Sequence, residues 1–244
     1  MSGELCIAGL GPGDPQLVTP EVTLALEAAT DIVGYISYVA RIAPRRGLTL
    51  HPSDNRVELD RARAALVMAA AGRRVVVVSS GDPGVFAMAS AVFEALEGQP
   101  DWQALDIRVL PGITAMLAAA AKAGAPLGHD FCAINLSDNL KPASLIEARV
   151  RAAADADFAM AFYNPRSTSR PHTLGRVLEL LRASCGPDRL ITFARAVSTP
   201  QENLLTVRLA EATPEMADMR TVVIVGNSAT RRVGRFVYTP RSAL

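Results

Sequence analysis

Near the start of the chain stands Cys6-Ile7-Ala8-Gly9-Leu10-Gly11-Pro12-Gly13-Asp14-Pro15, an apolar run that ends in three glycines, two prolines and an acid. The run predicts a buried β-strand over residues 5–10, and the glycines predict a tight turn at its carboxyl end. The next helix is expected only from Thr19-Pro20-Glu21, where an N-cap, a proline at the first helical position and an early acid coincide. This order of strand, loop and helix predicts the first unit of an α/β fold.

The same alternation continues to about residue 136. Further strands are expected over residues 31–35, 74–79, 107–110 and 131–136, and helices over 20–29, 60–71, 85–96 and 113–123. The strand at 74–79 contains four consecutive valines, which suits burial on both faces of a sheet. Parallel strands need crossover connections, usually helices, so we expect a mostly parallel sheet with helices on both faces.

The second half of the chain changes character. A helix over 144–154, a strand over 158–163 and a helix over 173–183 are followed directly by strands at 190–194, 203–208, 221–225 and 236–238. Strands that succeed one another without helices predict a second α/β lobe with a mixed sheet. Because Ser-Asp-Asn-Leu-Lys-Pro interrupts the pattern after Leu136, we place the boundary there, with lobes at 1–138 and 139–244.

Composition argues against several classes of protein. The 244 residues are 50% hydrophobic, 20% charged and 5% aromatic with a formal net charge of +1, so neither a nucleic-acid partner nor a membrane is expected. No apolar run approaches the roughly 18 residues that span a bilayer, and the N-terminus does not resemble a signal peptide. Cys6, Cys132 and Cys185 are far apart, so no metal site is predicted. We expect a cytoplasmic protein with reduced thiols.

The glycine loop does not match a dinucleotide site. A dinucleotide fingerprint starts its helix inside Gly-x-Gly-x-x-Gly and closes the second strand with an acid. Here Pro12 offers no N–H to a phosphate, the helix starts well beyond the glycines, and Asp31 opens the second strand. These features argue against a nicotinamide-dependent oxidoreductase. A binding module without catalysis stays open as a further alternative.

Three loops follow predicted strands of the first sheet. They span residues 9–14, 79–84 and 111–114, and all are rich in glycine, proline and small polar residues. In open α/β sheets, ligands bind at the carboxyl ends of the strands. The loops therefore predict one crevice lined by backbone groups and short side chains.

The chain resembles the tetrapyrrole (corrin and porphyrin) methyltransferases, which use S-adenosylmethionine. The resemblance rests on Gly9-Leu10-Gly11-Pro12-Gly13-Asp14, Gly81-Asp82-Pro83 and Pro111-Gly112-Ile113-Thr114-Ala115, in this order and at these distances. It extends through VGYISY at 33–38, SSGDPGVFAMA at 79–89, GHDFCAI at 128–134 and FYNPRS at 162–167. These stretches are most similar to members that methylate a precorrin in cobalamin biosynthesis and contract its ring. A methyltransferase acting on another precorrin or on a cobalt-precorrin is the alternative within the family.

The resemblance implies a two-lobed homodimer that binds S-adenosylmethionine in a trough between its lobes. This cofactor carries no phosphate, so backbone groups and short side chains can meet its adenine, ribose, amino-acid end and sulfonium. By position, the implied cofactor-binding residues are Leu10, Pro12, Gly81, Asp82, Val85, Thr114, Ala115, Tyr163, Asn164 and Ala196.

The implied substrate is a precorrin, a tetrapyrrole that carries several carboxylates. A nearly neutral chain must meet these with local cations, and arginine pairs bidentately with carboxylates. We expect substrate binding by Lys141, Arg166, Arg170 and Arg195, and further candidates for the same role are Arg41, Arg45 and Arg46. Ring contraction requires a proton acceptor, for which the candidates are Tyr35, His129 and Asp138.

Overall fold

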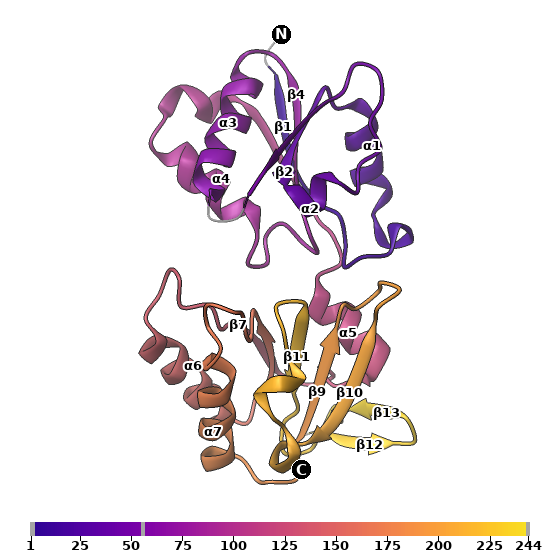
Figure 1. Ribbon diagram of the computed structural model, residues 1–244, viewed down its shortest axis with the longest axis vertical. Coiled ribbons are helices and arrows are strands. Elements are labelled where there is room, and N and C mark those ends of the chain that lie inside the picture. Colours follow the sequence, from indigo (N-terminus) through magenta and orange to yellow (C-terminus); the bar gives the residue numbers. More distant parts are fainter. Residues whose placement is uncertain (1–2, 55–56, 243–244) are drawn as a thin grey trace. The chain divides into compact units, whose positions relative to one another are not determined.

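The computed structural model describes residues 3–54 and 57–242 and divides into two compact units, Met1–Thr114 and Ala115–Leu244 (Figure 1). The first unit contains five parallel strands in the order β3-β2-β4-β1-β5. Their bounds are β1 (Glu4–Gly9), β2 (Asp31–Tyr35), β3 (Thr49–Ser53), β4 (Arg74–Ser79) and β5 (Asp106–Leu110). β4 pairs with β1 on one side and β2 on the other, and its valines are buried because hydrophobic cores cover both faces of the sheet.

Alternate residues of β1 belong to opposite hydrophobic cores, as the pleat of a strand requires. Leu5 and Ile7 pack with α3 (Glu58–Ala70) and α4 (Met88–Glu97). Cys6 and Ala8 pack in the core that includes residues of α1 (Pro20–Ala28) and α2 (Ile36–Val39). Figure 1 shows α3 and α4 on one side of the sheet and α1 and α2 on the other. The predicted parallel sheet with helices on both faces is confirmed.

The second unit is built on a mixed sheet in the order β10-β9-β11-β8-β7. Only β7 and β8 are parallel, and the other neighbours are antiparallel. The bounds are β7 (Phe131–Asn135), β8 (Ala159–Tyr163), β9 (Leu190–Arg195), β10 (Asn203–Arg208) and β11 (Thr221–Val225). This arrangement confirms the mixed sheet predicted for the second half.

Two helices cover one face of this sheet. α6 (Ala143–Asp155) and α7 (Thr173–Ser184) share a core with Phe162 of β8 and Phe193 of β9. α5 (Ala115–Ala123) contacts β11 and lies on the other side in Figure 1. A small sheet of β12 (Arg231–Val233), β13 (Phe236–Tyr238) and β6 (Gly124–Ala125) completes the unit.

The boundary between the units lies earlier than the expected division at residues 138 and 139. β7, which we expected in the first sheet, pairs in parallel with β8 from Phe131 opposite Ala159 to Asn135 opposite Tyr163. A parallel pair needs a crossover, and α6 supplies it within one sheet. The interruption after Leu136 is therefore a connection inside the second unit, and the chain passes from one unit to the next between Thr114 and Ala115.

Candidate active site

The first and second glycine loops are joined by their backbones at the carboxyl ends of β1 and β4. Gly11 donates its N–H to the carbonyl of Gly81 at 3.2 Å, and Gly81 donates to the carbonyl of Gly11 at 2.9 Å. Both residues lie in the left-handed region, with φ of 66° and 62°, where glycine adopts the backbone without steric cost. The two loops are thus fixed to each other.

The third loop interlocks with this pair. A Cβ added to Gly9 would lie 2.5 Å from the carbonyl oxygen of Gly81 and 2.8 Å from the amide nitrogen of Gly112. A Cβ added to Gly112 would lie 2.7 Å from the carbonyl oxygen of Gly9 and still closer to that of Gly81. Backbone atoms cannot move aside as a flexible side chain can, so glycines are required here for the three loops to approach one another closely.

Asp82 connects the second loop to the third. Its Oδ1 accepts the N–H of Gly84 at 2.8 Å, and its Oδ2 accepts the N–H of Gly112 at 3.1 Å. Hydrogen bonds to a carboxylate are among the stronger ones in proteins. The side chain of Asp82, predicted to bind the cofactor, therefore also holds the loops in register.

The interlocked edge has little to offer a phosphate. Phosphate sites present free backbone N–H groups. Here several loop N–H groups already donate to acceptors within the protein, namely those of Leu10, Gly11, Gly81, Gly84 and Gly112. Pro12 has no N–H. The interlocked edge therefore does not resemble a phosphate site.

The remaining first-unit candidates lie on or beside these loops. Leu10 and Thr114 are buried, whereas Pro12 and Val85 are partly exposed, and Val85 donates its N–H to the carbonyl of Asp82 at 3.3 Å. Tyr35, a candidate proton acceptor, ends β2 and its ring meets that of Tyr38 edge-on at 5.4 Å.

Tyr38 is a weaker acid than an ordinary tyrosine. Burial raises the pKa of its hydroxyl, and a hydrogen bond with the side chain of Ser80 and the charges of Arg41 and Arg61 oppose this only in part. The hydroxyl therefore stays protonated at neutral pH. It is suited to donating a hydrogen bond, not to removing a proton.

The second-unit candidates also lie at special backbone positions. Asn164 and Ala196 follow β8 and β9 directly and have φ of 51° and 49°, which costs energy for residues other than glycine. Asn164 donates its side-chain N–H to Oδ1 of Asn135 at 3.1 Å. Tyr163 accepts the N–H of Met116 at 2.9 Å and so caps the start of α5, which begins at Ala115. Strained backbone of this kind clusters at functional sites.

Two residues with the same property were missed by sequence reasoning. Ser198 has φ of 61°, and its hydroxyl is buried with no hydrogen-bond partner among the described residues. Phe86, in the loop before α4, has φ of 53° and an exposed fraction of 46%. Each lies in a loop that follows a strand, and this position does not reveal a left-handed backbone.

The four predicted substrate cations fall into two pairs. Arg170 donates to the carbonyl of Asn164 at 3.1 Å and lies 3.8 Å from a carboxylate oxygen of Asp138, a candidate proton acceptor. Arg195 donates to Asp218 at 2.7 Å. Both guanidinium groups are thus engaged inside the second unit. The substrate role of each arginine stays a prediction. It requires that a substrate carboxylate replace these internal partners.

Arg166 and Lys141 have different surroundings from this pair. Arg166 lines a cavity of about 350 Å³ beside α7, together with His172 and Arg176, and its buried Nε has no hydrogen-bond partner in the described part of the chain. Burial lowers the pKa of Lys141, and the charge of Arg149 adds to the effect.

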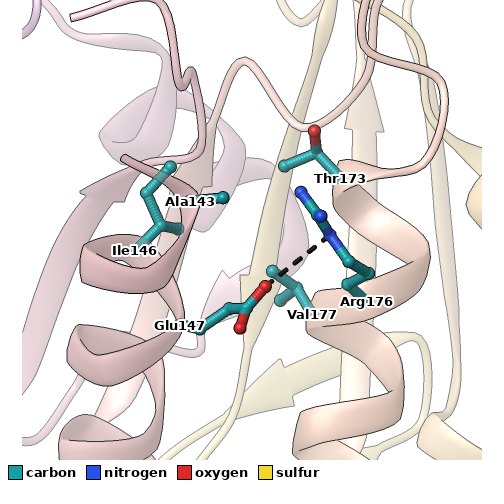
Figure 2. Close-up of a pocket in the computed structure, with 6 residues that line it drawn as sticks. All are labelled: Ala143, Ile146, Glu147, Thr173, Arg176 and Val177. Atoms are coloured by element: carbon teal, nitrogen blue, oxygen red, sulfur yellow. Dashed lines mark ion pairs between the residues drawn. The ribbon is translucent and has the colours of Figure 1, made fainter. Parts of the chain in front are cut away.

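Next to the Arg166 cavity is a smaller pocket between α6 and α7. Figure 2 shows that Arg176 points across it to Glu147, and their ion pair spans 3.6 Å. Thr173 lies at the upper end, and Ile146 and Val177 supply apolar walls. Arg176 is paired with Glu147, whereas Nε of Arg166 has no hydrogen-bond partner among the described residues.

The other candidates have ordinary surroundings. Nδ1 of His129 lies 3.8 Å from a carboxylate oxygen of the exposed Asp130. In residues 3–54 and 57–242 no group of three or more histidine, cysteine, aspartate or glutamate side chains is placed to hold a metal ion, and the three cysteines are free. No helix in the described part of the chain is long and apolar enough to cross a membrane.

A parallel sheet with three interlocked glycine loops, followed by a mixed α/β unit, defines a class of methyltransferase. The family model for Tetrapyrrole (Corrin/Porphyrin) Methylases matches residues 4–213, and the chain belongs to this family. The sequence resemblance is therefore confirmed.

Within this family, the chain is similar to several individual methyltransferases. The chain is 49% identical to a precorrin-3B C(17)-methyltransferase of Sinorhizobium sp., over 99% of this chain and 97% of that protein. It is 38% identical to a probable cobalt-factor III C(17)-methyltransferase of Salmonella typhimurium, over 97% of this chain and 98% of that protein. The crystal structure of the methyltransferase CobJ matches with a TM-score of 0.96 and 74% sequence identity, covering 98% of this chain and 100% of that one.

Proposed function

We propose that this protein transfers a methyl group from S-adenosylmethionine to carbon 17 of precorrin-3B, with ring contraction to precorrin-4, in cobalamin biosynthesis. The observation that carries the proposal is the similarity to the Sinorhizobium precorrin-3B C(17)-methyltransferase along 99% of the chain. The nicotinamide alternative loses its support because the glycine-loop N–H groups bond within the protein. Family membership makes a binding module without catalysis the less favoured alternative.

The residues proposed to hold the cofactor come from both units. In the first unit they are Leu10, Pro12, Gly81, Asp82, Val85 and Thr114, and in the second unit Ala115, Tyr163, Asn164 and Ala196. S-adenosylmethionine, when bound, supplies a methyl group on a sulfonium whose leaving group departs as a neutral thioether.

The protein's main task is alignment. Methyl transfer to a ring carbon needs little acid catalysis at the donor, so rate enhancement comes from orientation and exclusion of water. Arg166 and Lys141 are the proposed contacts to substrate carboxylates, with Arg170 and Arg195 as further contacts. Tyr35, His129 and Asp138 remain the proposed proton acceptors for ring contraction, and Tyr38 is suited to hold a substrate oxygen by hydrogen bonding.

The proposal is tested by incubating the protein with methyl-labelled S-adenosylmethionine and one candidate substrate at a time. The candidates are precorrin-3B, other precorrins and cobalt-factor III. We expect label in precorrin-3B alone and, by mass and absorption spectra, a ring-contracted product. Label in cobalt-factor III alone would instead favour the activity named for the Salmonella relative. Label in none of them would reject the proposal, whereas an uncontracted methylated product would reject only ring contraction.

We also propose that the protein works in the cytoplasm as a homodimer, as the family resemblance implies. Light scattering on the purified chain tests the second point, and a mass of one chain at working concentration would contradict it.

A further inference from the structure

The side chain of Arg41 binds the glycine loop that follows β1. Its Nη2 donates to the carbonyl of Leu10 at 2.7 Å and to the carbonyl of Gly13 at 3.3 Å. These carbonyls flank Gly11 and Pro12, and neither is used by the strand ladder of β1 with its neighbours. One guanidinium group thus joins the two ends of the turn.

The setting of Arg41 suits this role more than the substrate role expected from the sequence. Arg41 is an exposed residue whose guanidinium reaches back to a part-buried carbonyl, that of Leu10, and desolvation lowers its pKa. Among the described residues it forms no ion pair with a carboxylate, so the loop carbonyls are its fixed partners. Charged donors make stronger hydrogen bonds than neutral ones.

Backbone hydrogen bonds attach the same loop near both of its ends. Gly11 is bonded to Gly81, while Asp14 leads into the short helix Pro15–Leu17 and accepts the N–H of Gln16 at 2.9 Å. Between these points, Gly13 is held by the hydrogen bond from Arg41 to its carbonyl. Without Arg41, the turn would have more conformations to lose on binding a ligand.

We propose that Arg41 is a positioning residue that keeps the turn at residues 10–13 in the shape that binds S-adenosylmethionine. This inference rests on the proposed function, because it takes that loop as part of the cofactor site. Arg41 acts through the carbonyls of Leu10 and Gly13, and it is not required to touch the cofactor.

Arg45 provides a matched control four residues away. It also donates to three carbonyls, those of Leu26, Glu27 and Ala29, at 2.9, 2.7 and 2.7 Å. These carbonyls belong to the end of α1, not to the glycine loop. Arg45→Met and Arg41→Met therefore remove the same chemistry from two different places.

The experiment measures S-adenosylmethionine binding by calorimetry and amide hydrogen exchange over residues 11–17 without ligand. For Arg41→Met we expect a Kd raised about tenfold or more, faster exchange in the loop, and a larger change in KM for the cofactor than in kcat. Arg41→Lys should recover part of the affinity because it keeps a charged donor. Arg45→Met should lower thermal stability while leaving the Kd within about twofold of wild type.

Three results separate the alternatives. Unchanged affinity and exchange in a folded Arg41→Met variant would overturn the positioning role while leaving the proposed function in place. A raised KM for the tetrapyrrole alone, with unchanged cofactor affinity, would also overturn it and return Arg41 to substrate binding. Failure of the wild-type protein to bind S-adenosylmethionine would overturn the proposed function itself.

Discussion

The carboxylate of Asp82 accepts the N–H of Gly112 at 3.1 Å, across 30 positions of sequence, and thereby joins the loop after β4 to the loop after β5. The same carboxylate accepts the N–H of Gly84 within its own loop. Both carboxylate oxygens of Asp82, which the sequence predicts to bind the cofactor, thus already accept hydrogen bonds from the backbone. Its structural and binding roles can be separated by experiment.

Asp82→Asn should lower both stability and cofactor affinity. The amide keeps one oxygen acceptor and turns an N–H₂ group toward the second backbone N–H, which costs about 1–3 kcal/mol of unfolding free energy. Chemical denaturation without ligand measures this loss, and calorimetry measures the affinity. Asp101→Asn, at an exposed position, is the control and should be neutral. Unchanged stability of the ligand-free Asp82→Asn protein would show that Asp82 does not brace the loops.

Gly112→Ala should be strongly destabilising. The added Cβ would lie 2.7 Å from the carbonyl oxygen of Gly9, and the surrounding atoms belong to backbone. Overpacking of this kind costs about 1–3 kcal/mol or more, so we expect a Tm lowered by at least several degrees. Gly98→Ala is the matched control, because nothing lies within 4 Å of its added Cβ. Equal melting temperatures for the two variants would contradict the interlocked arrangement.

Asp157 connects stability to pH. Burial alone would raise the pKa of its carboxyl, but hydrogen bonds from Ser228 and the charge of Arg189 outweigh this and lower it below the ordinary 3.8. A lowered pKa in the folded state means that the stabilisation is present above 3.8 and is lost as the pH falls through the folded-state value. The relevant distances are 2.9 Å to the Ser228 N–H and 2.8 Å to Arg189.

Asp157→Asn should therefore lower the Tm at neutral pH by roughly 3 °C, and the difference from wild type should shrink in acid well below the ordinary pKa of 3.8. Asparagine suits the left-handed backbone at this position, where φ is 55°, so the substitution tests the charge and not the conformation. Ser228→Ala should reproduce part of the effect. A Tm difference that stays constant from neutral to acid pH would show that the charge of Asp157 is irrelevant.

Local sequence patterns predicted most of the fold, and they failed where tertiary contacts decide. β4 and β2 were predicted to the residue because apolar runs there are bounded by charge and by small residues. β3 was missed because Thr49–Ser53 contains His51 and Pro52. Proline is tolerated there because β3 is an edge strand, and His51 is held by Asp31 at 2.7 Å. α4 begins at Met88 instead of near residue 85 because Phe86 has a left-handed backbone.

The site divides in the same way. The three glycine loops could be located from the sequence, because glycine and proline mark turns and a parallel sheet brings strand ends to one edge. Their interlocking could not, since it depends on distances between Gly9, Gly81 and Gly112. Arg41 and Arg45 looked alike in sequence as cations for a substrate. Only the folded chain shows that both donate to backbone carbonyls.

Ser198 allows a test in the second unit. Its hydroxyl is buried with no partner among the described residues, two positions after Ala196, a proposed cofactor contact. Because the hydroxyl makes no internal hydrogen bond, Ser198→Ala should leave the unfolding free energy within about 0.5 kcal/mol of wild type. If a bound ligand satisfies the hydroxyl, the same change should raise the Kd for S-adenosylmethionine by roughly three- to tenfold.

Ser169→Ala, in an exposed loop of the same unit, is the control and should change neither quantity. Calorimetric titration and denaturant unfolding on the three proteins give both measurements. A marked loss of stability in Ser198→Ala would reveal an internal partner for the hydroxyl, and unchanged stability with unchanged affinity would remove Ser198 from the cofactor site. The buried hydroxyl would then have no role in ligand binding, and the left-handed backbone after β9 would have to be explained by the hydrogen bond of 2.6 Å from the Ser198 N–H to Glu202.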